Sequence, residues 1–190
     1  MKYIFLLIVI LSMSSYVFGF FKKDNPILND KSINIYDYSI NIIGDEKTSL
    51  DTFKGKKILF VNVASKCGYT PQYKQLQELY EKYNDRLVII GFPANDFLWQ
   101  EPGKNKEIKT FCSTTYGVNF PIVEKTVVKK KENQHSVYTW LSHKSLNGWN
   151  DVAPSWNFCK YLVDEEGKLL DMFTSKVTPL DEKIINHLKK

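Results

Sequence analysis

Apolar and polar residues alternate along the first strongly patterned part of the chain, from Ile33 to Leu50. A period of two is typical of strands with one buried face, and the Gly44-Asp45 pair in the middle favours a turn, so we expect a β-hairpin. Two continuous apolar runs follow, at Lys56–Ala64 and Arg86–Phe92. Such runs predict strands that are buried on both faces.

A helical repeat separates these two runs. It begins at Thr70, with Pro71 in the expected first turn. Its apolar positions, at helical spacing, are Leu76, Leu79, Tyr80 and Tyr83. A strand, a helix and a second strand in this order predict a right-handed βαβ unit.

The second half of the chain predicts further helices and strands around this unit. Helices are expected at about Asn105–Tyr116, at about Gln134–Ser145 and from near Pro179 to the C-terminus. Strands are expected in WNFCKYLVD and GKLLDMFT, joined by a turn at residues 165–167. The order is a hairpin, then β-α-β-α, then β-β-α. It indicates an α/β protein with a central mixed sheet flanked by helices, the arrangement of a thioredoxin-like fold.

The N-terminal segment differs from the rest. Lys2 precedes an apolar stretch of signal-peptide length, and Val17 and Gly19 are the small residues that permit cleavage. We therefore expect a signal peptide over residues 1–19, with a membrane anchor as the alternative. Residues 20–31 are a linker or an organelle-targeting extension, and residues 32–190 form the domain. This organisation predicts entry into the secretory pathway, followed by secretion or delivery to an organelle such as a plastid.

Composition narrows the class of protein. The chain has 190 residues, which suits one domain with a well-sized core. Its formal net charge is +5, with lysines spread along the chain rather than gathered in a stripe. We interpret them as solvated surface, and we expect neither nucleic-acid binding nor membrane insertion once the signal is removed.

Three cysteines are present, Cys67, Cys112 and Cys159. They are too few and too widely spaced for a disulfide scaffold, and they lack the Cys/His spacing of a zinc site, so we expect no metal. An odd number in a chain with a signal peptide indicates at least one reactive thiol. Cys159 alternates with its neighbours along a predicted strand, and we expect it to be a packed residue.

Cys67 stands between a predicted buried strand and the start of a predicted helix. Unpaired backbone N–H groups and the helix dipole favour a thiolate there, and Lys66 adds positive charge. The thiolate is the nucleophilic form, although the position alone is equally consistent with a buried structural residue. The residues Gly68–Thr70 contain no second cysteine, which excludes a C-x-x-C oxidoreductase. Ala64 stands where a peroxiredoxin usually has threonine, which disfavours that class.

Four motifs occur in order along the chain. They are NVASKCGYT, GFPANDFLWQEPG, FPIVEK and WNFCKYLVDEEGK. Together they resemble the thiol glutathione peroxidase family, the cysteine-containing relatives of the selenoenzymes, over about residues 32–190. The resemblance implies that Cys67 is the nucleophile, assisted by Gln100 of QEPG and by Trp156 and Asn157 of WNF.

The chemistry of these residues agrees with the implied roles. Attack of a thiolate on a peroxide O–O bond moves negative charge from sulfur to the departing oxygen. Neutral donors, here the amides of Gln100 and Asn157 and the indole of Trp156, stabilise charge at both ends without a fixed counter-ion. Taken without the resemblance, Trp156 is also consistent with a core residue and Asn157 with a strand cap.

The resemblance also implies how Cys67 is regenerated. Its sulfenic acid must be reduced before a second peroxide oxidises it further. Cys112 matches the resolving cysteine of the thioredoxin-dependent branch of the family, which implies a Cys67–Cys112 disulfide reduced by thioredoxin or, as second choice, by glutathione, with no bound cofactor. We expect the two helices to lie apart, so this step requires unwinding around Cys112. Ala94, where many relatives have a cysteine, removes a rival resolving thiol.

Two further departures from the family pattern bear on substrate and assembly. Leu98 and Trp99 replace a pair of small residues and add apolar surface, which favours lipid hydroperoxides or simply packs. The chain between Lys125 and Trp156 lacks the insertion that builds the interface of tetrameric relatives, so we expect a monomer. The three histidines, His135, His143 and His187, are expected to be exposed and without a catalytic role.

The resulting hypothesis is an antioxidant enzyme that reduces hydrogen peroxide and organic or lipid hydroperoxides. The alternative is a redox relay or sensor, in which Cys67 passes its oxidation to a partner protein. The same residues serve both functions. Sustained peroxide consumption with thioredoxin distinguishes them, because a pure relay stops after one turnover.

Overall fold

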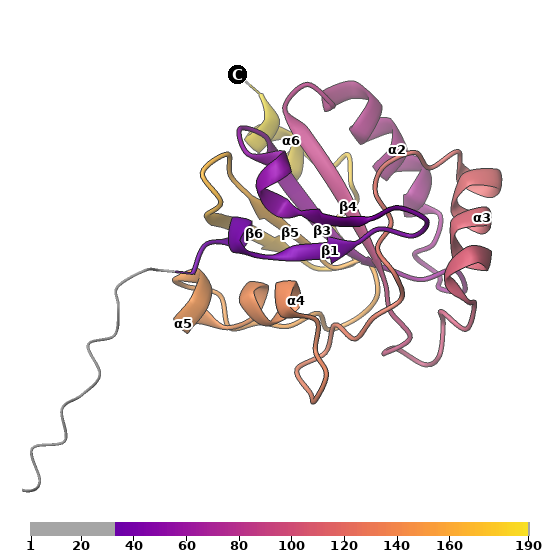
Figure 1. Ribbon diagram of the computed structural model, residues 1–190. Coiled ribbons are helices and arrows are strands. Elements are labelled where there is room, and N and C mark those ends of the chain that lie inside the picture. The colour runs from indigo at the N-terminus through magenta and orange to yellow at the C-terminus, as the bar shows by residue number, and fades with distance from the viewer. Residues whose placement is uncertain (1–32, 190) are drawn as a thin grey trace, which may run out of the picture. The chain divides into compact units, whose positions relative to one another are not determined.

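The computed structural model describes residues 33–189, so the expected signal peptide and the segment 20–31 lie outside the described residues. The strands of the central sheet are β3 (Lys57–Val63), β4 (Leu87–Pro93), β5 (Lys160–Val163) and β6 (Leu169–Phe173). Their order is β4-β3-β5-β6 (Figure 1). β3 and β4 pair in parallel, whereas β5 is antiparallel to both of its neighbours, so the sheet is mixed as expected.

The crossover between β3 and β4 contains α2 (Gln72–Tyr83), whose buried face includes Tyr73, Leu76 and Leu79. The helix starts at Gln72, two residues later than expected, with Pro71 as its N-cap. The Thr70 hydroxyl instead donates to the carbonyl of Ala64 (2.8 Å), which closes the turn that carries Cys67.

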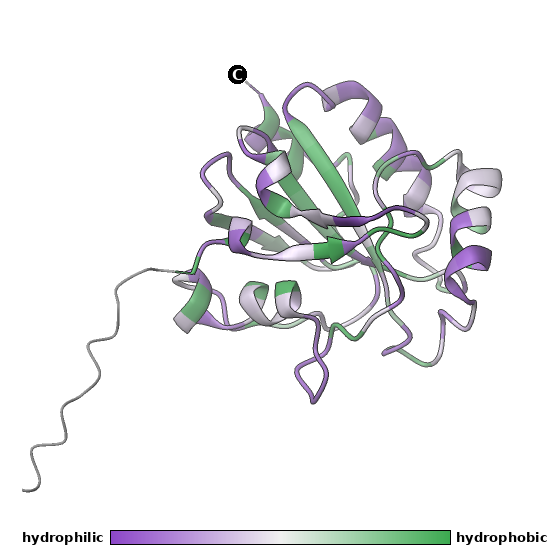
Figure 2. Ribbon diagram, in the orientation of Figure 1, coloured by the Kyte–Doolittle hydropathy of each residue, from purple (hydrophilic) through white to green (hydrophobic). Residues whose placement is uncertain are grey.

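Helices cover both faces of the sheet. α2, α3 (Asn105–Tyr116) and α6 (Glu182–Leu188) pack on one face, and α4 (Ser136–Leu141) packs on the other. Successive residues of β3 enter opposite cores, which explains its continuous apolar run. Figure 2 shows the central strands as the most hydrophobic elements.

The expected N-terminal hairpin is present, formed by β1 (Ser39–Asn41) and β2 (Lys47–Ser49). Its strands are shorter than the alternating pattern indicated, because 3₁₀ helices flank them: η1 (Ile35–Asp37) and η2 (Leu50–Phe53). The Asn34 side chain caps η1 by accepting from the N–H of Tyr36 (3.0 Å), a local bond that competes with strand pairing.

The helix expected at Gln134–Ser145 is wrong in detail. The chain forms α4 and a separate helix, α5 (Lys144–Asn147), because the Ser142 hydroxyl donates to the Tyr138 carbonyl (2.6 Å) at the break. The three histidines are half-buried rather than exposed. Within residues 33–189, no helix is long and apolar enough to cross a membrane.

The strand expected from Trp156 begins only at Lys160, and the final helix begins at Glu182 rather than near Pro179. Phe158 has a left-handed backbone (φ 64°), which interrupts a regular strand before β5. This interruption turns the segment that carries Trp156 and Asn157 out of the sheet.

Candidate active site

Cys67 lies in the turn between β3 and α2 and is 8% exposed. Its N–H donates to the Thr70 hydroxyl (3.0 Å), and the Tyr69 N–H donates to its sulfur (3.4 Å). Backbone donors of this kind stabilise negative charge on sulfur. The turn therefore holds the thiol in a nearly buried position, with backbone donors at its sulfur.

Gln100 and Asn157 are brought together from distant parts of the sequence. The Asn157 amide nitrogen donates to the Gln100 side-chain oxygen (2.9 Å). The Lys66 N–H, one residue before Cys67, donates to the Gln100 main-chain carbonyl (2.9 Å). These two bonds join both amide residues to the turn that carries the thiol.

Trp156 is half-buried beside this pair. Its carbonyl accepts from the Asn62 side chain (2.9 Å) at the end of β3, and its ring packs against Phe97 (5.7 Å between centroids). Within residues 33–189, neither the Trp156 indole nitrogen nor the Gln100 amide nitrogen donates a hydrogen bond. Both donors are therefore free to bind an oxygen atom of a substrate.

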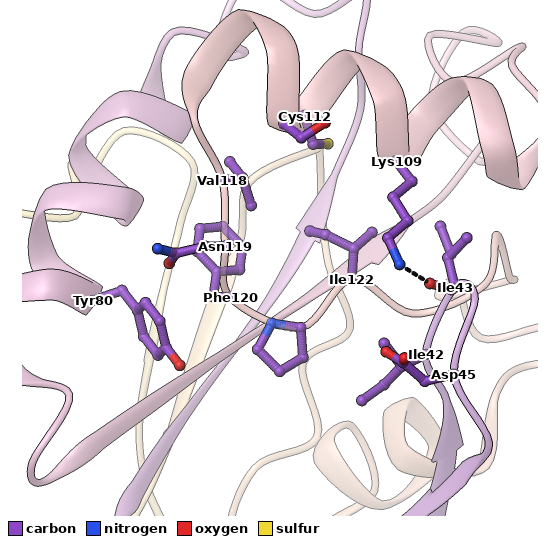
Figure 3. Close-up of a pocket in the computed structure, with 12 residues that line it drawn as sticks. Ile42, Ile43, Asp45, Tyr80, Lys109, Cys112, Val118, Asn119, Phe120 and Ile122 are labelled. Carbon is purple, nitrogen blue, oxygen red and sulfur yellow. Dashed lines mark hydrogen bonds between the residues drawn. The ribbon is translucent and has the colours of Figure 1, made fainter.

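Cys112 lies on α3 and is only 2% exposed. Burial raises the pKa of its thiol to about 11. It lines a cavity of about 300 Å³ between α3, the hairpin and the segment 118–122 (Figure 3). All three cysteines are free thiols, so the structure shows the reduced state and does not join Cys112 to Cys67.

Cys159 is fully buried, as expected of a packed residue. It belongs to the core on the opposite face of the sheet from Cys67 and Cys112, with the Ser155 and Ser175 hydroxyls at 3.8 and 3.7 Å from its sulfur. Residues 33–189 contain no cluster of three or more His, Cys, Asp or Glu side chains that could hold a metal ion.

Sequence reasoning missed the buried polar residues that support the site. Glu101 is fully buried next to Gln100, and burial raises the pKa of its carboxyl to about 7. The Ser175 hydroxyl donates to the Asn157 carbonyl (2.6 Å), and Lys160 is fully buried in β5. The sequence did carry one sign that Lys160 is buried, because this charged residue stands inside an apolar run. Nothing in the sequence indicated that Ser175 reaches this segment.

The mixed sheet with helices on both faces is a thioredoxin-like fold. A solved DsbF homologue from Corynebacterium diphtheriae shares this fold at 18% identity, with a TM-score of 0.57 over 80% of this chain and 83% of that one. Two peroxidase structures are more similar in sequence. Trgpx in its apo form is 32% identical (TM-score 0.61, 84% and 97% covered) and GPX1 of T. cruzi is 28% identical (TM-score 0.61, 82% and 95% covered).

Sequence comparisons identify the family. The glutathione peroxidase family model matches residues 35–142. "Glutathione peroxidase-like peroxiredoxin 2" of Saccharomyces cerevisiae is 45% identical over 83% of this chain and 98% of its own length. "Hydroperoxy fatty acid reductase gpx1" of Synechocystis is 43% identical over 76% of this chain and 89% of its own length. The chain belongs to the glutathione peroxidase family, as a cysteine-type peroxidase.

Proposed function

We propose that this thiol peroxidase acts through Cys67 and is regenerated through Cys112 by thioredoxin. The observation that carries the proposal is that Gln100 joins two segments: its main-chain carbonyl accepts from Lys66 beside Cys67, and its side chain accepts from Asn157, which follows Trp156 in the chain. This arrangement supplies a nucleophile and, beside it, neutral donors for the charge that develops on oxygen.

In the first step the Cys67 thiolate attacks one peroxide oxygen, forming an S–O bond as the O–O bond breaks. The sulfur is oxidised to a sulfenic acid, and the departing oxygen takes up a proton to leave as water or an alcohol. The free N–H donors of Gln100 and Trp156 stabilise the negative charge on oxygen during this transfer. Asn157, through its bond to the Gln100 side-chain oxygen, holds the Gln100 amide nitrogen toward the reaction site.

In the second step Cys112 condenses with the sulfenic acid to form a disulfide and water. Cys112 is buried on the core side of α3, so the helix must unwind locally before its sulfur reaches Cys67. An exposed disulfide suits a protein reductant, which supports thioredoxin over glutathione.

Substrate range, assembly and location are parts of the same proposal. The relative from Synechocystis that is named a hydroperoxy fatty acid reductase supports organic and lipid hydroperoxides beside hydrogen peroxide. We further propose that the enzyme acts as a monomer and enters the secretory pathway through its N-terminal signal. Size-exclusion chromatography with light scattering, and fusion of residues 1–31 to a fluorescent protein, test these two points.

The central experiment measures peroxide consumption coupled to thioredoxin and NADPH. Cys67→Ser abolishes turnover, Cys112→Ser stops after about one turnover, and Cys159→Ser, a matched change of a buried thiol, keeps turnover. Full thioredoxin-driven turnover in Cys112→Ser contradicts the two-cysteine cycle, and full turnover in Cys67→Ser contradicts the whole mechanism. If the wild-type protein itself stops after one turnover, the result supports a redox relay instead of a peroxidase.

A further inference from the structure

A cavity of about 590 Å³ lies beside the residues of the proposed mechanism. It is lined by Tyr69, Ser155, Trp156, Thr174, Ser175 and Lys176. Tyr69 ties the cavity to the nucleophile, because its N–H donates to the Cys67 sulfur (3.4 Å). Trp156 supplies the indole N–H of the proposed mechanism. A molecule in this cavity therefore touches two residues of the candidate site.

The lining of the cavity carries a single charge. Lys176 is the only lysine or arginine among the lining residues, and no Asp or Glu lines the cavity. Lys176 is exposed, and its ammonium makes no hydrogen bond or ion pair within residues 33–189. The other lining residues are two aromatic residues, two serines and a threonine. The cavity thus combines aromatic walls with one free positive charge.

The backbone around Lys176 is held in place although its side chain is exposed. On one side, the Ser175 hydroxyl donates to the Asn157 carbonyl (2.6 Å). On the other side, the Val177 carbonyl accepts from the buried Lys160 ammonium (2.7 Å). Because both neighbours are anchored, binding an anion has to order only the lysine side chain, which keeps the entropic cost small.

The other lysines near the site are less suited to bind an anion. Lys131 pairs with the Asp96 carboxyl (2.6 Å), and the Lys129 ammonium lies over the Phe97 ring (4.7 Å). Lys66 lines a cavity of about 340 Å³ that two carboxyl side chains also line, which disfavours an anion there. Lys176 is therefore the cation beside the site that is best placed for an anionic group.

We propose that this cavity binds a fatty-acid hydroperoxide, with the Lys176 ammonium pairing with the carboxylate while the peroxide group lies at Cys67. The inference rests on the peroxidase function proposed above and narrows its organic substrate to a free acid. Such a molecule carries its carboxylate and its peroxide at separate points of one apolar chain. This matches a free cation and a thiol with aromatic side chains beside them. The volume lies in the range of small-molecule sites, whereas a phospholipid brings a second acyl chain and a head group.

The test measures how fast each of three peroxides oxidises Cys67 in the full-length protein. The loss of the free thiol is followed by mass spectrometry after an acid quench, so no reductant is needed. The peroxides are hydrogen peroxide, linoleic acid hydroperoxide and the methyl ester of that hydroperoxide, all in one non-ionic detergent. The ester keeps the chain and the peroxide but removes the negative charge.

We expect the second-order rate constant to be about fivefold higher for the acid than for the ester, the size expected of an ion pair at an exposed position. Lys176→Met removes this preference and Lys176→Arg retains it, because only the charge is required. Neither variant changes the rate with hydrogen peroxide, which has no carboxylate.

Lys74→Met is the matched control, because Lys74 is an exposed lysine of α2 that does not line the cavity. It keeps the preference for the acid, which separates a direct contact from general electrostatic attraction. Equal rates with acid and ester in the wild type overturn the proposal, and so does an unchanged preference in Lys176→Met.

Two other occupants of the cavity give different results. If Lys176→Met slows oxidation by a phospholipid hydroperoxide but not by the free acid, Lys176 binds a phosphate head group and the proposal fails. If the variant instead raises the KM for thioredoxin in the coupled assay and keeps the preference for the acid, the cavity receives the reductant and the proposal fails as well. A wild-type Cys67 that no peroxide oxidises, hydrogen peroxide included, contradicts the proposed function itself.

Discussion

Leu98 and Trp99 occupy backbone conformations that ordinary residues avoid. Both have left-handed backbones (φ 49° and 52°), and their side chains are 68% and 77% exposed. Each such position costs about 1 kcal/mol for a residue other than glycine. Packing does not offset this strain energy, because both side chains are exposed to solvent. The pair directly precedes Gln100 in the sequence. We therefore propose that the pair contacts substrate, as an apolar edge of the site.

Replacing the pair by glycine separates stability from substrate preference. In a Leu98→Gly/Trp99→Gly variant, relief of backbone strain outweighs the added freedom of the unfolded chain, and we expect the free energy of unfolding to rise by about 1 kcal/mol. The rate with hydrogen peroxide stays unchanged, and the rate with a fatty-acid hydroperoxide falls about tenfold, because apolar contact is lost. Urea unfolding and steady-state kinetics with both peroxides measure these effects.

Asn133→Gly serves as the control, since Asn133 is also exposed with a left-handed backbone (φ 66°) but lies in another loop. It leaves the ratio of the two peroxide rates unchanged. An unaltered ratio in the double glycine variant shows that Leu98 and Trp99 do not contact lipid substrates.

At the scale of an element, α3 holds Cys112, the resolving cysteine of the proposed cycle, in a buried position. Ile108 and Cys112 form its buried stripe, and Gly117 ends it with a left-handed C-cap (φ 64°) whose N–H bonds to the Cys112 and Ser113 carbonyls. Cys112 therefore sits in the last turn or so before the cap, where helices fray most readily. The C-terminal end of α3 is the part that must open for disulfide formation.

Weakening this cap accelerates the opening. Gly117→Ala forces a side chain into the left-handed conformation and costs about 1 kcal/mol, so the open form becomes about fivefold more populated. We expect the rate of disulfide formation to rise by up to that factor in a single turnover, while the rate of sulfenic acid formation is unchanged. Hydrogen exchange of the α3 amides reports the opening directly.

Gly148→Ala is the matched control, because Gly148 caps α5 in a similar way (φ 96°) on the other face of the sheet. It lowers stability by a similar amount without changing the rate of disulfide formation. Slower disulfide formation in Gly117→Ala would mean that an intact helix end is needed for the reaction.

At the scale of the whole molecule, a buried ammonium ties together three segments around the site. Lys160 donates to the Gln72 side chain (2.6 Å), the Phe158 carbonyl (2.8 Å) and the Val177 carbonyl (2.7 Å). Three acceptors match the three N–H bonds of a charged lysine. Gln72 in turn donates to the Ser175 carbonyl (2.7 Å), so one network connects the start of α2, the Asn157 segment and the loop before α6.

This network makes stability depend on pH. Burial lowers the pKa of Lys160 in the folded protein to about 7, from an ordinary value of 10.5. Between these two values the unfolded chain binds more protons than the folded protein, so the free energy of unfolding contributed by Lys160 rises with pH from about 7 to 10.5. Below pH 7 both states are protonated and the contribution is constant.

Lys160→Met removes this dependence. We expect it to destabilise the fold by about 3 kcal/mol at pH 7, because three buried acceptors lose their donor, and to flatten the rise of stability between pH 7 and 10. Urea unfolding at several pH values measures both effects. Lys168→Met, which changes an exposed lysine in the adjacent turn, alters stability by less than about 0.5 kcal/mol. A variant as stable as the wild type, with an unchanged slope, contradicts the role of the network.

Much of the fold follows from local pattern. The two apolar runs, the helix between them and the helix at Asn105–Tyr116 were predicted nearly to the residue, since period and length suffice for long elements. The errors lie where side chains bond the backbone or the backbone turns left-handed: Asn34 shortens the hairpin, Ser142 divides the helix after Gln134, and the left-handed Phe158 delays β5. These bonds are not visible in a periodic pattern.

The sequence by itself determined the family, and it led to the nucleophile and the polar partners that we propose, because these depend on residue type and on motif spacing. The tertiary structure decided what no local pattern carries: that the amides of Asn157 and Gln100 bond each other, that Cys112 is buried in the same core as Cys67, and that Glu101 is fully buried beside Gln100. The physical reason is that burial and hydrogen bonding between distant segments arise only when the chain is folded, and burial is also what raises the pKa of Glu101 to about 7.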